Sequence, residues 1–159
     1  MIDIFWRCVA IGIGATVLMD IWALILAAFF GQARANWAPV GRWFWHLKSG
    51  KVFHDSIADA PPYSGELALG WIGHYGVGIV YAFLLVVFTG TQWLANPTFL
   101  PALIFGLITV GAGWFLLQPG LGLGWAASKT PNSNKVRSLN ILAHIVFAVG
   151  LYCTALLVR

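Results

Sequence analysis

The sequence predicts an all-α integral membrane protein, a bundle of four transmembrane helices in which residues 1–159 form one membrane domain. Hydrophobic residues make up 60% of the chain and charged residues only 9%, and the mean hydropathy is +0.82. A soluble domain of this length carries about a quarter charged residues. Four apolar runs are each long enough to cross the bilayer, which takes about 20 helical residues. The predicted spans are residues 5–30, 67–88, 99–118 with an irregular extension to 127, and 138–158.

The first span carries Asp20 inside an apolar stretch from Cys8 to Phe30. The triplet Ala33-Arg34-Ala35 resembles a signal-peptide cleavage site. The apolar stretch is nevertheless longer than the 7–15 residues typical of a signal core. We therefore predict a retained helix.

The loop between the first two spans, residues 31–66, is predicted to be partly ordered. Its segment GRWFWHLKSGKVF either lies in the headgroup layer as a short interfacial segment or forms an ordinary covering loop. Its candidate site residues are His46, His54, Asp55 and Glu66. Glu66 is expected chiefly to stabilise the start of the second span, at the positive end of the helix dipole. His54-Asp55-Ser56 does not predict a catalytic triad, because a triad is a geometry and not a string of residues.

The third span ends irregularly at LLQPGLGLGWAASKTP. Pro119 removes a helical hydrogen bond, and the glycines after it weaken the helix. Broken backbone at membrane depth is tolerated where protein covers it or where it faces a water-filled cavity, as at transporter sites. The alternative is a kinked helix end that rises to the interface.

The distribution of Lys and Arg predicts the orientation. Seven of these residues lie in loops 31–66 and 128–137, against two elsewhere, Arg7 and Arg159. Positive charges mark cytoplasmic loops, so both loops are predicted to be cytoplasmic and both termini outside. Topology thus accounts for the net charge of +4. The lipid bilayer, and not nucleic acid, is the expected partner.

Each span places one polar side chain at a similar predicted depth, roughly 10–15 Å from its cytoplasmic end. These residues are Asp20, His74, Gln118 and His144. Small residues recur at about four-residue spacing on the same faces, less so in the third span, and small residues let helices approach closely and form polar contacts. We predict a shared buried cluster that binds a ligand. The alternative is that these side chains are structural hydrogen-bonding groups between the helices.

Two tyrosines are further candidates for ligand binding. Tyr75 follows His74, and Tyr152 lies on the same face as His144. The histidines of the second and fourth spans each follow a small residue and precede a tyrosine, Tyr81 or Tyr152, by seven or eight positions. Two helical hairpins related as parallel repeats would explain this pattern, and chance is the alternative.

No cofactor and no metal site is predicted. The two cysteines form no CxxC motif, and the histidines match no HExxH-like spacing. Haem or metal ligation by His74 and His144 is the alternative that the pairing of these two residues leaves open.

Several motifs together resemble a family of small four-span bacterial inner-membrane proteins of unknown function. They are GATVLMDIWAL, VGRWFWHL, FHDSIADAPP, GELALGWIGHYGVGIVYA, LQPGLGLGWAASKTP and RSLNILAHIVFAVGLY. The resemblance covers nearly the whole chain and implies location in the inner membrane, but it implies no activity. The motif positions are Asp20, His46, His54, Asp55, Pro61, Glu66, His74, Tyr75, Gln118, Pro119, Ser128, Thr130, Pro131 and His144.

The predicted function is binding or transport of a proton, an ion or a small polar ligand. Homo-oligomers are expected if anything crosses the membrane, because four helices alone enclose little space. One alternative is a membrane-embedded enzyme that acts on a lipid or quinone, with histidines as general acid and base. The other is an accessory subunit of a larger membrane complex. The sequence leans against an enzyme without deciding the matter.

Overall fold

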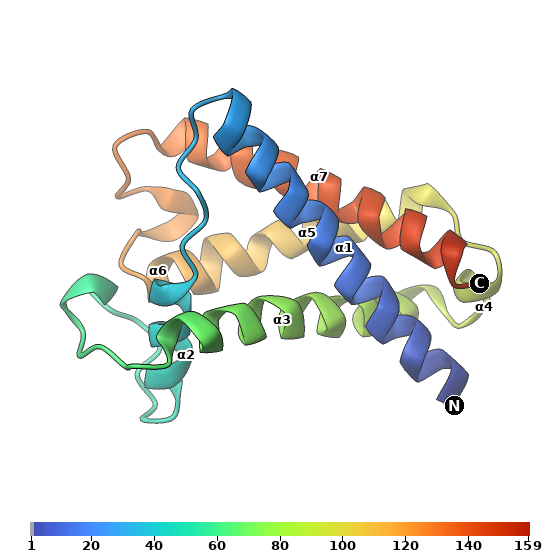
Figure 1. Ribbon diagram of the computed structural model, residues 1–159, viewed down its shortest axis with the longest axis horizontal. Helices are drawn as coiled ribbons and strands as arrows, with labels where there is room; N and C mark the ends of the chain where they lie inside the picture. The colour runs from blue at the N-terminus through green and yellow to red at the C-terminus, as the bar shows by residue number, and fades with distance from the viewer. Residues whose placement is uncertain (1) are drawn as a thin grey trace. The chain divides into compact units, whose positions relative to one another are not determined.

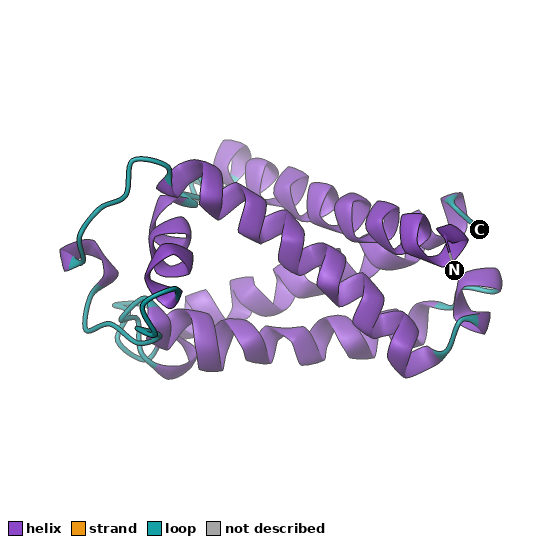
Figure 2. Cartoon of the chain, turned by 90° about the horizontal axis from the view of Figure 1, so that it is seen from below, coloured by secondary structure: helices purple, strands orange, loops and turns teal. Residues whose placement is uncertain are grey.

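The computed structural model describes residues 2–159, which contain helices and loops but no strand (Figure 2). The elements in chain order are α1 (Ile2–Phe29), α2 (Ala38–Leu47), the 3₁₀ turn η1 (Ile57–Asp59), α3 (Glu66–Thr89), α4 (Gln92–Ala95), α5 (Phe99–Ala112), the π-helical turn η2 (Gly113–Leu117), α6 (Gln118–Gly120), the 3₁₀ turn η3 (Trp125–Ala127) and α7 (Ser133–Leu157) (Figure 1).

Four stretches are helical, long and apolar enough to cross a membrane. They are Ile2–Phe29, Glu66–Thr89, Phe99–Gly120 and Ser133–Leu157. The predicted fold class, an all-α membrane protein with four apolar helices, is confirmed. The last of these helices begins at Ser133, a little earlier than the predicted start at 138.

The chain forms two compact units. Unit 1 consists of the residues up to Arg34, Tyr75–Thr109 and Leu142–Arg159, and unit 2 consists of Ala35–His74 and Val110–Ile141. Helices α3, α5 and α7 therefore each contribute residues to both units.

Unit 1 is a bundle of parts of α1, α3, α5 and α7. Its buried core consists of Cys8, Ile11, Ala15, Ala82, Leu85, Val86, Trp93, Leu94, Ala102, Phe105, Phe147, Leu151 and Ala155. Small residues let the helices touch: a Cβ at Gly12 would overlap the backbone of Ile79, and one at Gly150 would overlap that of Ala15. The two chain ends and α4 lie at the same end of this bundle (Figures 1 and 2).

Unit 2 is built around α2 and the loop that follows it. Its buried core residues are Trp43, Ile57 and Ala60. Gly41 of α2 lies directly against the carbonyl of Glu66, so α2 crosses the first turns of α3. The region predicted to be partly ordered therefore contains a packed helix.

The end of the third span is irregular and covered by this loop. A π-helical turn precedes α6, and Pro119 lies in the first turn of α6, where its missing N–H is tolerated. Gly122 then adopts φ +86° and contacts the carbonyl of Asp55. The N–H of Ile57 donates to the carbonyl of Leu121 at 3.2 Å. The broken backbone is thus covered by protein, one of the two environments in which such a break is tolerated.

Candidate functional site

Asp20 and Tyr75 join α1 to α3 inside unit 1. The phenol of Tyr75 donates to the Oδ2 atom of Asp20 at 2.9 Å. Both side chains are partly buried in helices that are otherwise almost wholly apolar. The structure therefore brings together two of the six predicted ligand-binding residues.

His144 joins α7 to α5 inside the same unit. Its Nδ1 atom lies 2.9 Å from the hydroxyl of Thr109 and 3.2 Å from the carbonyl of Gly106. Thr109 itself donates to that carbonyl at 2.6 Å, so both oxygens are placed as acceptors for an Nδ1 proton. With the proton there, a neutral ring keeps a lone pair on Nε2 that can accept a proton or a ligand's hydrogen bond.

His74 lies among aromatic rings in unit 2. Its imidazole stacks on the indole of Trp37, with ring centroids 3.8 Å apart, and meets the edge of Trp71 at 5.9 Å. Trp37 immediately precedes α2. This stacking holds His74 against the segment that leads into α2.

Gln118 is part of a second polar cluster in unit 2. The Oδ1 atom of Asn140 in α7 accepts from Nε2 of Gln118 at 2.8 Å and from the indole N–H of Trp114 at 3.1 Å. Gln118 is 8% exposed, and its Oε1 atom has no hydrogen-bond partner among residues 2–159. Trp114 lies in the π-helical turn, a feature that frequently marks functional sites. Gln118 thus offers a buried acceptor at a break in the third span.

The remaining candidates, His46, His54, Asp55, Glu66 and Ser128, all belong to unit 2 and have different surroundings. Glu66 forms an ion pair with Arg42 at 2.7 Å. Asp55 and Ser128 are exposed. His46 and His54 contact each other, with His54 Nε2 and His46 Nδ1 3.2 Å apart.

The proposed four-residue cluster stays a prediction. Asp20 and His144 belong to unit 1, and His74 and Gln118 belong to unit 2. Within unit 1, Tyr152 meets the ring of Phe99 edge to face at 5.7 Å. The ligand-binding role of Tyr152 likewise stays a prediction.

Four residues that hold these groups in place were not predicted as site residues, namely Thr109, Trp114, Asn140 and Arg42. Trp114 and Asn140 do lie on the helix faces that were predicted to point inward. A signal existed for Asn140, because it precedes His144 by one helical turn. A signal also existed for Arg42, because it and Glu66 carry opposite charges on either side of one loop. Thr109 gave none, because its role depends on which helix lies beside α5.

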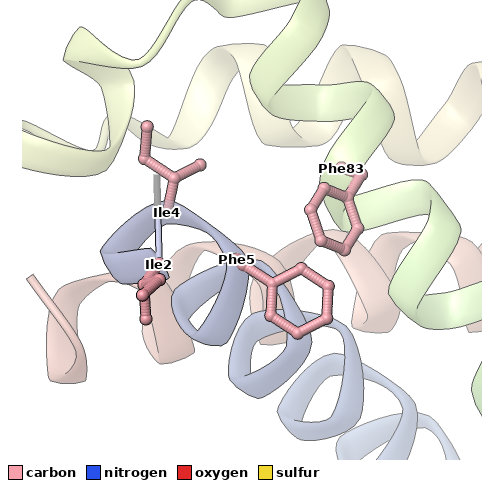
Figure 3. A pocket seen from close by; sticks show the side chains of 4 residues that line it. All are labelled: Ile2, Ile4, Phe5 and Phe83. Carbon is pink, nitrogen blue, oxygen red and sulfur yellow. The ribbon is translucent and has the colours of Figure 1, made fainter.

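A shallow apolar hollow of about 420 Å³ lies elsewhere in unit 1. Figure 3 shows that Ile2, Ile4 and Phe5 from the start of α1 and Phe83 from α3 line it. The rings of Phe5 and Phe83 are 5.6 Å apart. The lining suits hydrocarbon and offers no group for a polar ligand. Among residues 2–159, no three His, Cys, Asp or Glu side chains come together as a set of metal ligands.

Four apolar helices of spanning length, with hydrogen-bonded polar side chains inside them, define an α-helical membrane protein. The chain belongs to the family described as "Protein of unknown function (DUF2938)", which it matches over residues 9–158. The predicted membership of a small four-span family of unknown function is confirmed. No curated protein and no solved structure matches the chain.

Proposed function

We propose that this protein is a bacterial inner-membrane protein that binds or transports a proton, an ion or another small polar ligand through polar side chains in its spans. The hydrogen bond between Asp20 and Tyr75 is the observation that carries the proposal. A carboxylate within a bilayer costs a few kcal/mol even on lenient scales, so such groups are candidate functional sites.

The chemistry of this pair suits reversible binding. A phenol is a neutral donor that stabilises a carboxylate by a hydrogen bond without replacing its charge. Asp20 can therefore exchange a proton or contact a cation while Tyr75 holds its orientation. The half-satisfied amide of Gln118 supports the same class of function, because a ligand's donor would satisfy its buried Oε1 atom.

The orientation in this proposal follows from charge. The loops rich in Lys and Arg are cytoplasmic and both termini lie outside. Asp20 then lies in the cytoplasmic half of the first span. Association of several copies is expected if the ligand crosses the membrane, because four helices enclose little space.

The proposal is tested with purified protein in liposomes that contain a pH-sensitive dye. A potassium gradient and valinomycin drive proton entry, and the rate is compared with that of empty vesicles. We expect Asp20→Asn to lower the rate about ten-fold or more and Tyr75→Phe to lower it less, because the carboxyl group remains. Asp59→Asn, which alters an exposed carboxylate outside the spans, is the matched control and should leave the rate unchanged.

Binding without transport is tested separately by infrared difference spectroscopy between acidic and alkaline buffer. We expect a protonated carboxyl band that Asp20→Asn removes and that Tyr75→Phe shifts, since the phenol bonds to that carboxyl group. Wild-type flux equal to that of Asp20→Asn, together with a carboxyl spectrum that this substitution does not alter, would contradict the proposal.

A further inference from the structure

Two histidines of unit 2 form a continuous hydrogen-bonded chain outside the spans. His54, which is 7% exposed, places Nδ1 2.9 Å from the carbonyl of Gly120. His46 of α2 places Nε2 3.2 Å from the carbonyl of Pro61. The two remaining ring nitrogens, His54 Nε2 and His46 Nδ1, face each other at 3.2 Å.

The outer contacts determine where the protons must be. A carbonyl oxygen only accepts hydrogen bonds, so each outer nitrogen must carry a proton to bond there. A neutral imidazole has one proton, and both rings would then present lone pairs to each other across the inner contact. That arrangement is repulsive and leaves one bond unmade. A third proton, placed between the inner nitrogens, completes all three bonds.

We infer that His46 and His54 together form a proton-binding site in which one proton, shared between His54 Nε2 and His46 Nδ1, gives the pair a single positive charge. The proton ties the loop that carries His54 to α2, while the carbonyl contact ties the same ring to α6. This site is separate from Asp20 and does not depend on the function proposed for that residue.

The charged groups around the pair are compatible with this added charge. The charged residues on the elements that pack against it are Arg42 and Lys48 on α2, Lys51, Asp55 and Asp59 in the loop, and Glu66 at the start of α3. Arg42 and Glu66 form an ion pair and offset each other. Helix α6, residues 118–120, carries no titratable side chain.

The sharing of a proton makes the attachment of the loop dependent on pH. When the pH rises and the shared proton leaves, the contact between the rings loses its hydrogen bond. The loop then has one attachment fewer, although others remain, such as the hydrogen bond from the N–H of Ile57 to the carbonyl of Leu121. The loop is therefore held most tightly on the acidic side of the titration and is released as the pH increases.

The direct test is nitrogen NMR of ¹⁵N-histidine-labelled, full-length protein in lipid nanodiscs. As the pH is raised, we expect the rings of His46 and His54 to lose one shared proton together. Below that transition, a single proton should couple to His54 Nε2 and His46 Nδ1. Two independent titrations with no proton shared between the rings would overturn the assignment.

Variants test the effect on the loop by hydrogen exchange of residues 52–61, corrected for intrinsic rates. In the wild-type protein we expect the protection of these amides from exchange to fall about ten-fold as the pH rises. A change of this size corresponds to the loss of about one hydrogen bond. His46→Gln should abolish this pH dependence, because one neutral amide can supply both N–H donors. Lys51→Gln, which removes an exposed charge from the same loop, is the matched control and should behave as the wild type. Equal pH dependence in the wild type and His46→Gln would contradict the inference.

A metal ion bound between His54 Nε2 and His46 Nδ1 is the alternative to a shared proton. Histidines that bind metals usually donate their other N–H to a carbonyl, as the outer nitrogens of both rings can do here. One equivalent of Zn²⁺ added at the acidic end should leave the shared-proton signal and the loop protection unchanged. Displacement of that signal by stoichiometric Zn²⁺, with stronger protection of the loop, would make this a metal site and overturn the proton assignment.

Discussion

Arg42 connects more backbone than any other side chain described in unit 2. Its Nε and Nη2 atoms donate to the two oxygens of Glu66 at 2.7 and 2.9 Å. Its Nη1 atom lies 3.1 to 3.2 Å from the carbonyls of Ile57, Ala58 and Ala60. The hydrogen bonds to Glu66 raise the pKa of Arg42 above its ordinary value, so its charge persists throughout any pH range in which the protein is studied.

Arg42→Lys tests this role, because lysine keeps the charge but loses the planar fork that binds two oxygens at once. We expect the free energy of unfolding to fall by about 1.5 to 3 kcal/mol, the usual contribution of hydrogen bonds to a charged group. Denaturant unfolding in detergent, followed by tryptophan fluorescence, measures the change. The control is Arg34→Lys at an exposed arginine, and an equal loss in both variants would contradict the role of Arg42.

Sequence reasoning predicted the polar groups of the site better than their partners. Asp20 and His144 were conspicuous because each interrupts an apolar run. Tyr75 was also a candidate, but its bond to Asp20 depends on how α1 packs against α3 and could not be predicted from the sequence. The pairing of His54 with His46 could not be predicted, because it requires the loop to close back onto α2.

Helix contacts in unit 1 depend on positions where a side chain would not fit. A Cβ on Gly12 would overlap the Cα of Ile79, so α1 and α3 touch at backbone distance. Gly76 lies in α3, as Ile79 does, and a Cβ added at Gly76 would meet no atom of another element within 4 Å. The two glycines therefore provide a matched pair within membrane helices.

Gly12→Ala should separate α1 from α3 and lower stability by about 1 to 3 kcal/mol, the cost of overpacking. Gly76→Ala should be neutral or slightly stabilising, because alanine favours a helix. Thermal unfolding in detergent, measured by the loss of monodisperse protein, distinguishes them. Equal midpoints for both variants would show that the helices can move apart without cost.

Apolar length made the four long helices predictable, since little else in a sequence resembles twenty apolar residues in a row. For the segment that forms α2, the sequence allows either a short interfacial segment or an ordinary covering loop, because aromatic and basic side chains suit both. Gly122, in the left-handed conformation, lies against the carbonyl of Asp55, which is distant in sequence, and no local motif predicts the π-helical turn. Local sequence therefore pointed to irregularity at Pro119 without defining its form.

On the scale of the whole molecule, the proposed topology has an even number of spans and therefore puts both chain ends on one side of the membrane. This agrees with the two chain ends lying at the same end of unit 1 (Figure 1). The proposed orientation places both chain ends on the outer side of the membrane. It rests on the excess of Lys and Arg in the loops at 31–66 and 128–137.

Single cysteines, introduced after Cys8 and Cys153 are replaced by alanine, test the orientation. With a membrane-impermeant thiol reagent on intact spheroplasts, we expect Asn96→Cys to be labelled and Lys51→Cys to be protected until the membrane is opened. Both positions are exposed in the structure. The reverse labelling pattern would invert the proposed topology while leaving the four spans in place.

The contact between Ala15 and Gly150 has a consequence for biosynthesis. Nearly the whole chain lies between these residues. The surface of α1 that packs against α7 is therefore synthesised early, and α7 is the last helix that can cover it. Translation proceeds at about 5–20 residues per second, which leaves that surface without its final neighbour for several seconds in every molecule. A chain that ends before Gly150 never gains that neighbour, and we expect membrane proteases to remove such fragments faster than the complete protein.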